Sequence, residues 1–153
     1  VDVTVTTAAG TSIVDAGDQF RYVSAHYCAL IDLSRAPTVW TKNRAQRFYV
    51  TIFNCGTRSW PATGYTRVDI SVRFTTKAGS GYNTQRYWLP YFTYHNLDRN
   101  VAPNGYATLA ITIKPNFRGT AKLEAEMIKL HQFWFGRYLY RPAQNVDVTV
   151  VVH

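Results

Sequence analysis

The stretch Val68-Asp69-Ile70-Ser71-Val72-Arg73-Phe74 decides the fold, because its apolar residues alternate strictly with polar ones. Successive side chains of a β-strand point to opposite faces of the sheet, so this alternation predicts a strand with a core face and a solvent face. On this reading Asp69, Ser71 and Arg73 lie outside. The same period of two recurs at residues 48–53, 107–113, 123–128 and 146–152.

Turn-forming residues separate these alternating runs. Glycine, proline and asparagine gather at residues 54–56, 61–64, 77–81 and 102–105, each between two apolar stretches. No segment sustains a 3.6-residue period with capping residues, so we expect little helix. Several short strands with regular turn signals predict an all-β, antiparallel two-sheet sandwich.

Length and composition fit one folded domain. The chain has 153 residues, of which 46% are hydrophobic and only 17% charged, which disfavours disorder. No apolar run approaches the ~18 residues that a membrane-spanning helix needs. The sequence therefore predicts a domain with a real hydrophobic core and no membrane span.

Basic residues outnumber acidic ones, 17 to 9, giving a formal charge of +8. A nucleic-acid binder usually concentrates such charge in a patch or a tail, whereas these residues are spread from Arg21 to Arg141. We therefore favour solvated outward strand positions and disfavour nucleic acid as a partner. Attraction to an acidic polymer remains the alternative.

Three motifs in order resemble the immunoglobulin-like four-tryptophan domain found in selective-autophagy receptors and in secreted bacterial proteins as an accessory module. They are Asn54-Cys55-Gly56-Thr57-Arg58-Ser59-Trp60-Pro61, the turn Val101-Ala102-Pro103-Asn104-Gly105, and residues 119–128 followed by Phe133-Trp134-Phe135. The resemblance covers residues 47–152. It departs from the family at Ala125, where a tryptophan is common, at Leu130-His131, and in the long aromatic segment 87–96.

The resemblance implies an immunoglobulin-like fold. We expect residues 25–153 to form the sandwich and residues 1–24, which hold a strand-like segment well before the first clear strand, to be an amino-terminal extension carrying a β arm. It also implies that Trp40, Trp60 and Trp134 are structural core aromatics. It implies almost nothing about function, because this fold hosts many uses.

Catalytic motifs are lacking in the sequence. Glu124 and Glu126 share one face of a strand, but Lys122 and Lys129 lie nearby, so we expect a salt-bridged outward face and not an acid–base pair. The four histidines have no metal-ligand spacing, and the cysteines form no C-x-x-C. We therefore expect no enzyme activity, no metal and no cofactor.

Cys28 and Cys55 are the only cysteines. They could form one disulfide or stay buried and reduced, and the sequence does not decide between these states. The chain begins at Val1, which fits a cleaved export signal or an excised fragment equally. Extended structure rich in threonine and tyrosine favours an exported, extracellular or cell-surface protein.

An aromatic row surrounds Pro90. Exposed aromatic side chains stack on sugar rings or pack against another protein, and flanking arginines could bind acidic groups. The competing interpretation is a covered second sheet face. The predicted contact surface comprises Arg86, Tyr87, Trp88, Tyr91, Phe92, Tyr94 and Arg99.

The pentapeptide Val1-Asp2-Val3-Thr4-Val5 is repeated identically at residues 146–150. Coincidence in a chain rich in valine and threonine is one explanation. Alternatively, residues 1–5 end a preceding tandem domain, or they are an arm that adds to the sheet of a neighbouring subunit. In an arm, Val1, Val3 and Val5 would present the apolar face.

These observations favour a non-catalytic extracellular assembly subunit or module that polymerises or docks by β-strand addition, as in a surface fibre. The expected partner is a second copy or a neighbouring domain. The alternative is a carbohydrate-binding accessory module of a secreted polysaccharide-active protein, with polysaccharide as its partner.

Overall fold

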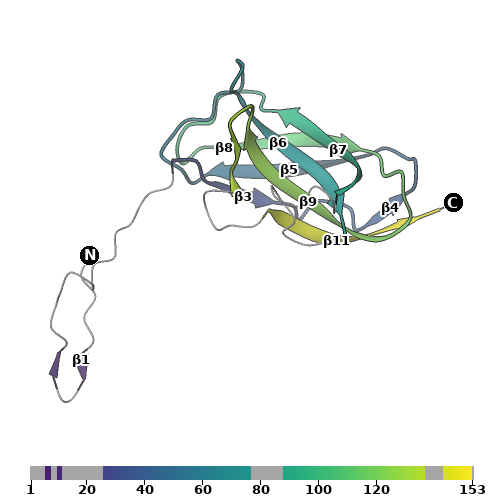
Figure 1. Cartoon of the computed structure of the whole chain (residues 1–153), viewed down its shortest axis with the longest axis horizontal. Helices are drawn as coiled ribbons and strands as arrows, with labels where there is room; N and C mark the ends of the chain where they lie inside the picture. Colours follow the sequence, from purple (N-terminus) through teal and green to yellow (C-terminus); the bar gives the residue numbers. More distant parts are fainter. Residues whose placement is uncertain (1–5, 8–9, 12–25, 77–87, 137–142, 153) are drawn as a thin grey trace.

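The computed structural model describes residues 6–7, 10–11, 26–76, 88–136 and 143–152. The elements of this part of the chain are β-strands, and most of them form two stacked sheets (Figure 1). The predicted all-β two-sheet sandwich is therefore confirmed.

The larger sheet has the strand order β4-β11-β9-β6-β7. A short strand, β10, pairs with the end of β9. The bounds are β4 Val39–Thr41, β6 Val68–Thr75, β7 Trp88–Asn96, β9 Gly119–Lys129, β10 Phe133–Trp134 and β11 Gln144–Val151. All neighbours are antiparallel except β11 and β4, which run parallel and depart from the purely antiparallel prediction.

The smaller sheet has the order β3-β5-β8, all antiparallel. Its strands are β3 Ala29–Asp32, β5 Gln46–Asn54 and β8 Tyr106–Ile113. Immunoglobulin sandwiches pair their first, second and fifth strands in one sheet and their third, sixth and seventh in the other. The pairing of β3, β5 and β8 against β6, β9 and β11 follows this arrangement, so the fold is an immunoglobulin-like β-sandwich.

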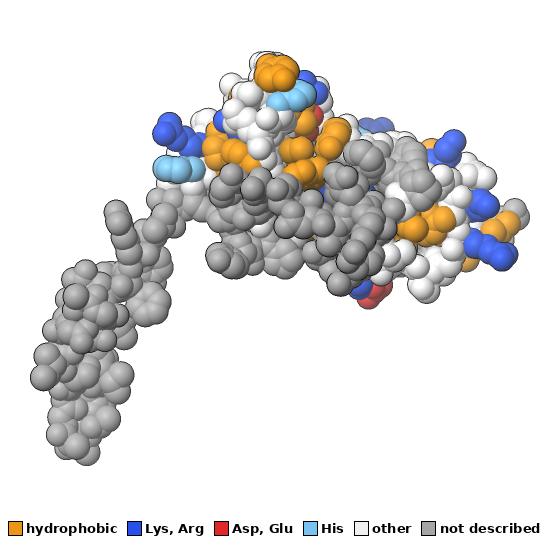
Figure 2. Space-filling view, viewed as in Figure 1, with side chains coloured by type: hydrophobic (Ala, Val, Ile, Leu, Met, Phe, Trp, Pro, Cys, Tyr) orange, Lys and Arg blue, Asp and Glu red, His pale blue; other side chains and the backbone are white. Residues whose placement is uncertain are grey.

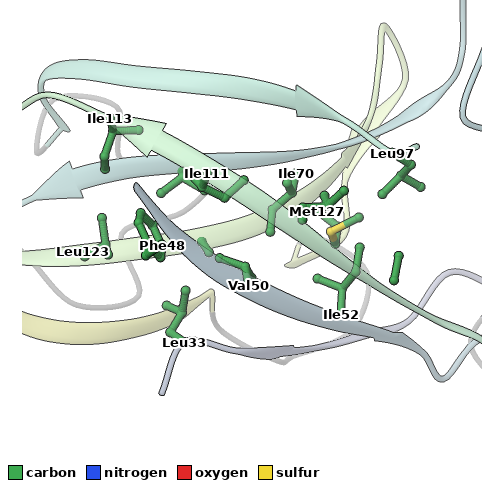
Figure 3. Packing of buried hydrophobic residues seen from close by; sticks show 14 of the residues in the cluster. Leu33, Phe48, Val50, Ile52, Ile70, Leu97, Ile111, Ile113, Leu123 and Met127 are labelled. Carbon is green, nitrogen blue, oxygen red and sulfur yellow. The ribbon is translucent and has the colours of Figure 1, made fainter. Parts of the chain in front are cut away.

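The core lies between the two sheets and is built from the inward positions of the alternating strands (Figure 3). Val50 and Ile52 of β5 and Ile111 of β8 face Ile70 of β6 and Met127 of β9. Trp40 is fully buried and meets the rings of Phe48 and Phe74 edge to face. Aromatic pairs of this geometry contribute about 0.5–1.5 kcal/mol beyond the area they bury.

The central part of the outer face of the larger sheet, on β6 and β9, is also buried, and here the prediction was wrong. All eight residues of β6 are buried, Asp69, Ser71 and Arg73 included, although their alternation predicted solvent exposure. Strict alternation fixes which side chains share a face, but it does not say whether another part of the chain covers that face. The neighbouring β9 behaves alike, with Glu124 and Glu126 buried.

Two of the sequence motifs meet around the fully buried Asn54. Its amide Nδ2 donates to the carbonyl oxygens of Arg58 and Val101, at 2.9 and 3.0 Å, and its Oδ1 accepts the Gly56 N–H. Trp60 and Val101 form an isolated antiparallel bridge between the same two loops. The side chain of Asn54 therefore joins the loop after β5 to the loop before β8.

Cys28 and Cys55 are joined by a disulfide, with Cα atoms 4.9 Å apart. The bond ties the start of β3 to the end of β5, where the Cys55 N–H also donates to the Cys28 carbonyl. Gly56 lies directly against this segment: a Cβ there would stand 2.6 Å from the His26 carbonyl oxygen. Only glycine fits so close to the passing backbone.

The described part of the amino-terminal extension is a small hairpin. Strands β1 Thr6–Thr7 and β2 Gly10–Thr11 pair antiparallel and form a two-stranded sheet separate from the sandwich (Figure 1).

Candidate functional site

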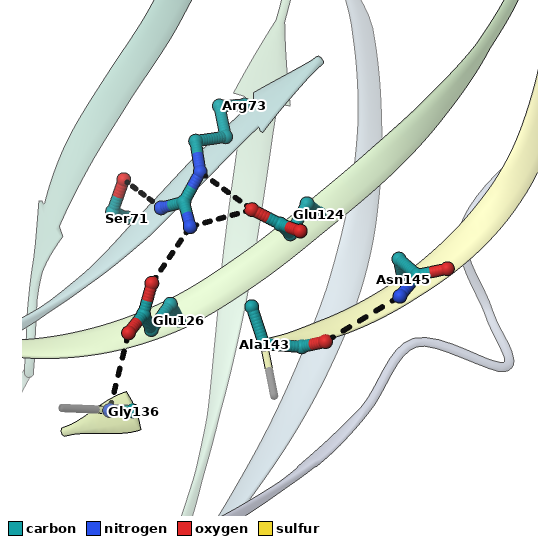
Figure 4. A network of polar contacts seen from close by, with 7 residues as sticks. All are labelled: Ser71, Arg73, Glu124, Glu126, Gly136, Ala143 and Asn145. Carbon is teal, nitrogen blue, oxygen red and sulfur yellow. Dashed lines mark hydrogen bonds and ion pairs between the residues drawn. The ribbon is translucent and has the colours of Figure 1, made fainter. Parts of the chain in front are cut away.

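The buried outer face of the larger sheet carries a cluster of charged side chains. Arg73 on β6 lies opposite Glu124 on β9, and Ser71 lies opposite Glu126. The Arg73 guanidinium lies between the two carboxylates: Nη2 is 2.6 Å from Glu124 Oε1 and 2.7 Å from Glu126 Oε2, and Nη1 donates to Ser71 Oγ (Figure 4). Charge-assisted bonds of this length are about twice as strong as neutral ones.

Residues from the end of β10 cover this cluster. Trp134 pairs in register with Ile128, which places its indole on the outer face, 5.1 Å from the Arg73 guanidinium carbon. The Gly136 N–H donates to Glu126 Oε1 at 3.1 Å. Trp134 is 8% exposed, but it is not part of the core between the sheets. The charge cluster therefore holds the chain segment after β9 onto the sheet.

Burial shifts the proton affinities of this face. Desolvation raises the pKa of Glu126, although Arg73 and the Gly136 N–H oppose the change. Desolvation also raises the pKa of Asp69, against the hydrogen bond that Arg67 Nε donates to it at 3.0 Å. His95 lies opposite Ile70 in register and so belongs to the inner face; burial lowers its pKa, opposed by the charge of Asp69. Each of these groups is thus shifted toward its neutral form.

The expected solvated ion pairs of Glu124 and Glu126 with Lys122 and Lys129 do not form. Both carboxylates pair with Arg73. Lys122 instead pairs with Asp147 on β11, and Lys129 Nζ donates to the Tyr27 hydroxyl at 2.7 Å. The sequence predicted the shared face of the two glutamates correctly, but it missed their partner because Arg73 is 51 residues away from Glu124.

Most of the predicted aromatic contact surface lies outside what the structure describes. Arg86 and Tyr87 are not among the described residues, nor are the side chains of Trp88, Tyr91 and Phe92. Tyr94 is described: it is 43% exposed and its ring lies 6.1 Å from that of Trp134. Arg99 pairs with Asp98 and reaches the Tyr106 carbonyl on the smaller sheet.

The remaining predicted residues are the valines of the arm and the core tryptophans. Val1, Val3 and Val5 lie outside the described residues. Trp40 and Trp60 are fully buried between the sheets, where Trp60 meets Phe135 edge to face.

A second aromatic surface lies on the outer face of the smaller sheet. Leu30, Phe53 and Tyr106 are cross-strand neighbours on β3, β5 and β8, and Tyr106 is 66% exposed. The next row holds Thr51 and Thr108, whose hydroxyls are 3.1 Å apart, and Tyr49 follows, 47% exposed. The alternation of Tyr49, Thr51 and Phe53 indicated this second face, but nothing in the alternation singles it out as a contact surface.

Charge and metal ligands add no further site in the described residues. Figure 2 shows Lys and Arg side chains at several separate places on the face drawn, without one basic patch among the residues it colours. No group of three His, Cys, Asp or Glu in the described part could hold a metal ion. Within the same ranges, the structure contains no helix long and apolar enough to cross a membrane.

Fold and surfaces thus define the class of the protein: a small immunoglobulin-like β-sandwich module. No protein-family model matches the sequence. No curated protein matches it either.

Among solved structures, this chain is similar to the CARDB domain of the PF1109 protein from Pyrococcus furiosus. The crystal structure of that domain in complex with di-metal ions is 14% identical, with a TM-score of 0.48, over 92% of this chain and 100% of the other. The solution structure of the same domain is 15% identical, with a TM-score of 0.47, over 82% and 94%. A β-glucosidase from Listeria innocua is 10% identical, with a TM-score of 0.42, over 82% of this chain and 16% of the enzyme.

Proposed function

We propose that this protein is a non-catalytic extracellular structural module that polymerises or docks by β-strand addition. The observation that carries the proposal is the pairing of β11, which contains the second copy of the repeated pentapeptide. Residues 146–150 pair antiparallel with β9, and the last two of them also pair parallel with β4. A sequence identical to Val1–Val5 therefore forms a paired strand of this sandwich at residues 146–150.

The side chains of β11 alternate between a buried face and an exposed face. Val148 and Val150 are buried in the core, whereas Asp147 and Thr149 are exposed. The same alternation in the amino-terminal copy gives an apolar face of Val1, Val3 and Val5 and a polar face of Asp2 and Thr4. An added strand gains affinity from main-chain hydrogen bonds and specificity from such alternate side chains.

Two further observations support the extracellular setting and the family membership that belong to the proposal. The Cys28–Cys55 disulfide fits an oxidising, extracellular setting, because cytosolic thiols are kept reduced. Membership in the four-tryptophan family is supported by the contacts among Asn54, Gly56, Trp60 and Val101, which join two of its motifs.

The test is the concentration dependence of molar mass. Light scattering coupled to size-exclusion chromatography should show the full chain associating as its concentration rises. A double variant, Val3→Asp with Val5→Asp, should remain monomeric, because two charges on the apolar face oppose its burial. Thr4→Asp, which adds a charge to the polar face, is the matched control and should associate like the parent. A full chain that stays monomeric over the accessible concentration range contradicts the proposal.

A carbohydrate-binding accessory module is the second candidate, and the outer face of the smaller sheet favours it. Tyr106 and Tyr49 expose flat rings, with the hydroxyls of Thr51 and Thr108 between them. Sugar rings stack on exposed aromatic faces and hydrogen-bond to nearby hydroxyls. This spacing of rings and hydroxyls differs from the contiguous apolar centre of a protein interface.

Affinity electrophoresis through gels containing barley β-glucan, xylan or polygalacturonate tests this candidate. Retardation that is lost in Tyr106→Ala or Tyr49→Ala supports binding at this face. Loss in Trp88→Ala alone places binding at the aromatic row predicted from the sequence. If none of the three polysaccharides retards the protein, the candidate fails.

A further inference from the structure

The edge strands of the two sheets differ in how well they are protected from pairing with a further strand. The larger sheet ends in β4 and β7, and the smaller sheet ends in β3 and β8. Natural edge strands avoid further pairing by being short, by carrying proline or charge, or by a bulge. β4 has three residues and β3 has four, ending at Asp32, and β7 contains Pro90 and shifts register opposite Arg73–Thr75.

β8 has none of these protections. Its eight residues, YATLAITI, include no charge and no proline, and it keeps register with β5 over eight successive pairs. Its outward side chains, Tyr106, Thr108, Ala110 and Thr112, are all exposed. Among the described strands, none pairs with the other side of β8. A long, flat, uncharged edge of this kind is a site for strand addition.

The hydrogen-bond pattern shows which backbone groups of β8 are available. The Asn54 N–H donates to the Gly105 carbonyl, and bonded positions in an antiparallel ladder recur every second residue. Residues 107, 109, 111 and 113 therefore bond to β5, while the N–H and C=O of residues 108, 110 and 112 point away from it. The Tyr106 carbonyl, reached by Arg99 Nη2, belongs to the same outward set.

The first five residues of the chain fit within the length of this edge and match its alternating pattern. Five residues of strand extend about 17 Å, against about 26 Å for the eight of β8. Laid beside β8, Val1, Val3 and Val5 would lengthen the inner layer next to the buried Leu109. Asp2 and Thr4 would then lie on the exposed face beside two successive outward residues of β8, such as Thr108 and Ala110. The buried and exposed parity of residues 146–150 in β11 is the same.

We propose that the free edge of β8 is the acceptor for the Val1–Val5 segment of a second copy of this chain. This inference rests on the proposed function and names its partner surface. Donor and acceptor are different parts of the molecule, so the contact is heterologous and each added copy leaves a free β8 at the growing end. Such a contact produces an open filament unless a rotation closes it into a ring.

Complementation between two full-length variants tests the pairing. The donor-deficient variant is Val3→Asp with Val5→Asp, and the acceptor-deficient variant is Ala110→Pro, which removes one outward N–H without breaking a bond to β5. Each variant alone should be monomeric. Their equimolar mixture should form a dimer and stop there, because one supplies the arm and the other the edge. Light scattering gives the molar mass of each sample.

A second acceptor variant guards against misfolding of the first. Thr108→Lys places a charge on the edge strand, and Thr51→Lys places the same charge on the same face one strand inward. Thr108→Lys should abolish association, while Thr51→Lys should leave it unchanged. Circular dichroism and the melting temperature establish that each variant is folded.

The outcomes separate this inference from the function it rests on. If the parent chain never associates, the proposed function fails, and this inference with it. If the arm variant abolishes association but Ala110→Pro and Thr108→Lys associate like the parent, strand addition stands and β8 is not the acceptor. If both changes lower the melting temperature while every sample stays monomeric, the arm pairs with β8 of its own chain, which overturns the second copy as partner.

Discussion

Arg73 and Glu124 form a fully buried ion pair across neighbouring strands β6 and β9, with Nη2 and Oε1 2.6 Å apart. Glu126 completes the cluster on the other side of the guanidinium. Removing one partner of such a pair leaves charge without compensation in a region of low dielectric constant. The outer face of the larger sheet is therefore sensitive to the loss of a single charged side chain.

Arg73→Met should lower the free energy of unfolding by about 3–5 kcal/mol, because two buried carboxylates lose their shared cation. Arg118→Met, a change at an exposed position, should stay within about 0.5 kcal/mol of the parent. Urea denaturation monitored by tryptophan fluorescence measures both. A loss for Arg73→Met no larger than that of the control would contradict the role given to the cluster.

Replacing the whole cluster with apolar residues should restore much of that stability. The triple variant Arg73→Met, Glu124→Leu, Glu126→Leu removes the cation together with both carboxylates, and such replacements are often neutral or stabilising. We expect it to unfold at a higher urea concentration than Arg73→Met alone. The same denaturation experiment decides, and a triple variant less stable than the single one would show that the charges are needed for packing.

Stability should respond to pH through Glu126 in the opposite sense to ordinary acid denaturation. Burial raises the folded-state pKa of this carboxyl above its ordinary value of 4.5, so the folded state binds the proton more tightly than the unfolded chain does. Its contribution to stability is therefore complete below about pH 4.5 and is lost as the pH rises through the folded-state pKa.

Glu126→Gln isolates this contribution, because Asp69 shifts in the same direction and is present in both proteins. The difference in unfolding free energy, parent minus variant, should be largest in acid and decline as the pH rises above about 4.5. Urea denaturation at several pH values measures it. A difference that grows with pH would mean that Arg73 lowers the pKa of Glu126 more than burial raises it.

The fold could be predicted from the sequence because alternation is a property of single strands. Residues such as Ile70 and Val72 fix the core face of β6 without reference to the rest of the chain. The buried charge cluster could not be predicted in the same way. Its burial depends on Trp134, which lies over the sheet only because β10 turns back along β9. The resemblance to a family implied that Trp134 is a structural core aromatic; it is buried, and its register with Ile128 places it on the outer face, apart from the cluster between the sheets.

The candidate contact surfaces show the same limit. Sequence reasoning selected the aromatic row around Pro90 because aromatic residues are dense there, a property visible along the chain. The face formed by Leu30, Phe53 and Tyr106 draws on three strands, and these residues are more than 20 positions apart in the sequence, so only the strand register brings them together. The free edge of β8 depends likewise on sheet order, which alternation does not give.

The Cys28–Cys55 disulfide should contribute about 3–4 kcal/mol by restricting the unfolded chain, given its sequence separation of 27. The double variant Cys28→Ser with Cys55→Ser should therefore melt well below the parent. The parent treated with reductant should melt near the variant, which serves as the check that the bond itself is responsible. A melting temperature unaffected by both treatments would show that the backbone contacts of Cys55 and Arg58 hold the segment without the bond.

Gly56→Ala should destabilise the fold by about 1–3 kcal/mol or more, because the added Cβ would meet backbone atoms that cannot rotate away. The nearest are the His26 carbonyl oxygen at 2.6 Å and the Cys28 nitrogen at 2.9 Å. Gly64→Ala is the matched control: its φ of +91° strains any side chain, yet nothing lies within 4 Å of the new Cβ. That control should lose only about 1–2 kcal/mol. Thermal denaturation of both variants compares steric contact with backbone strain, and equal losses would show that the segment at His26 moves away freely.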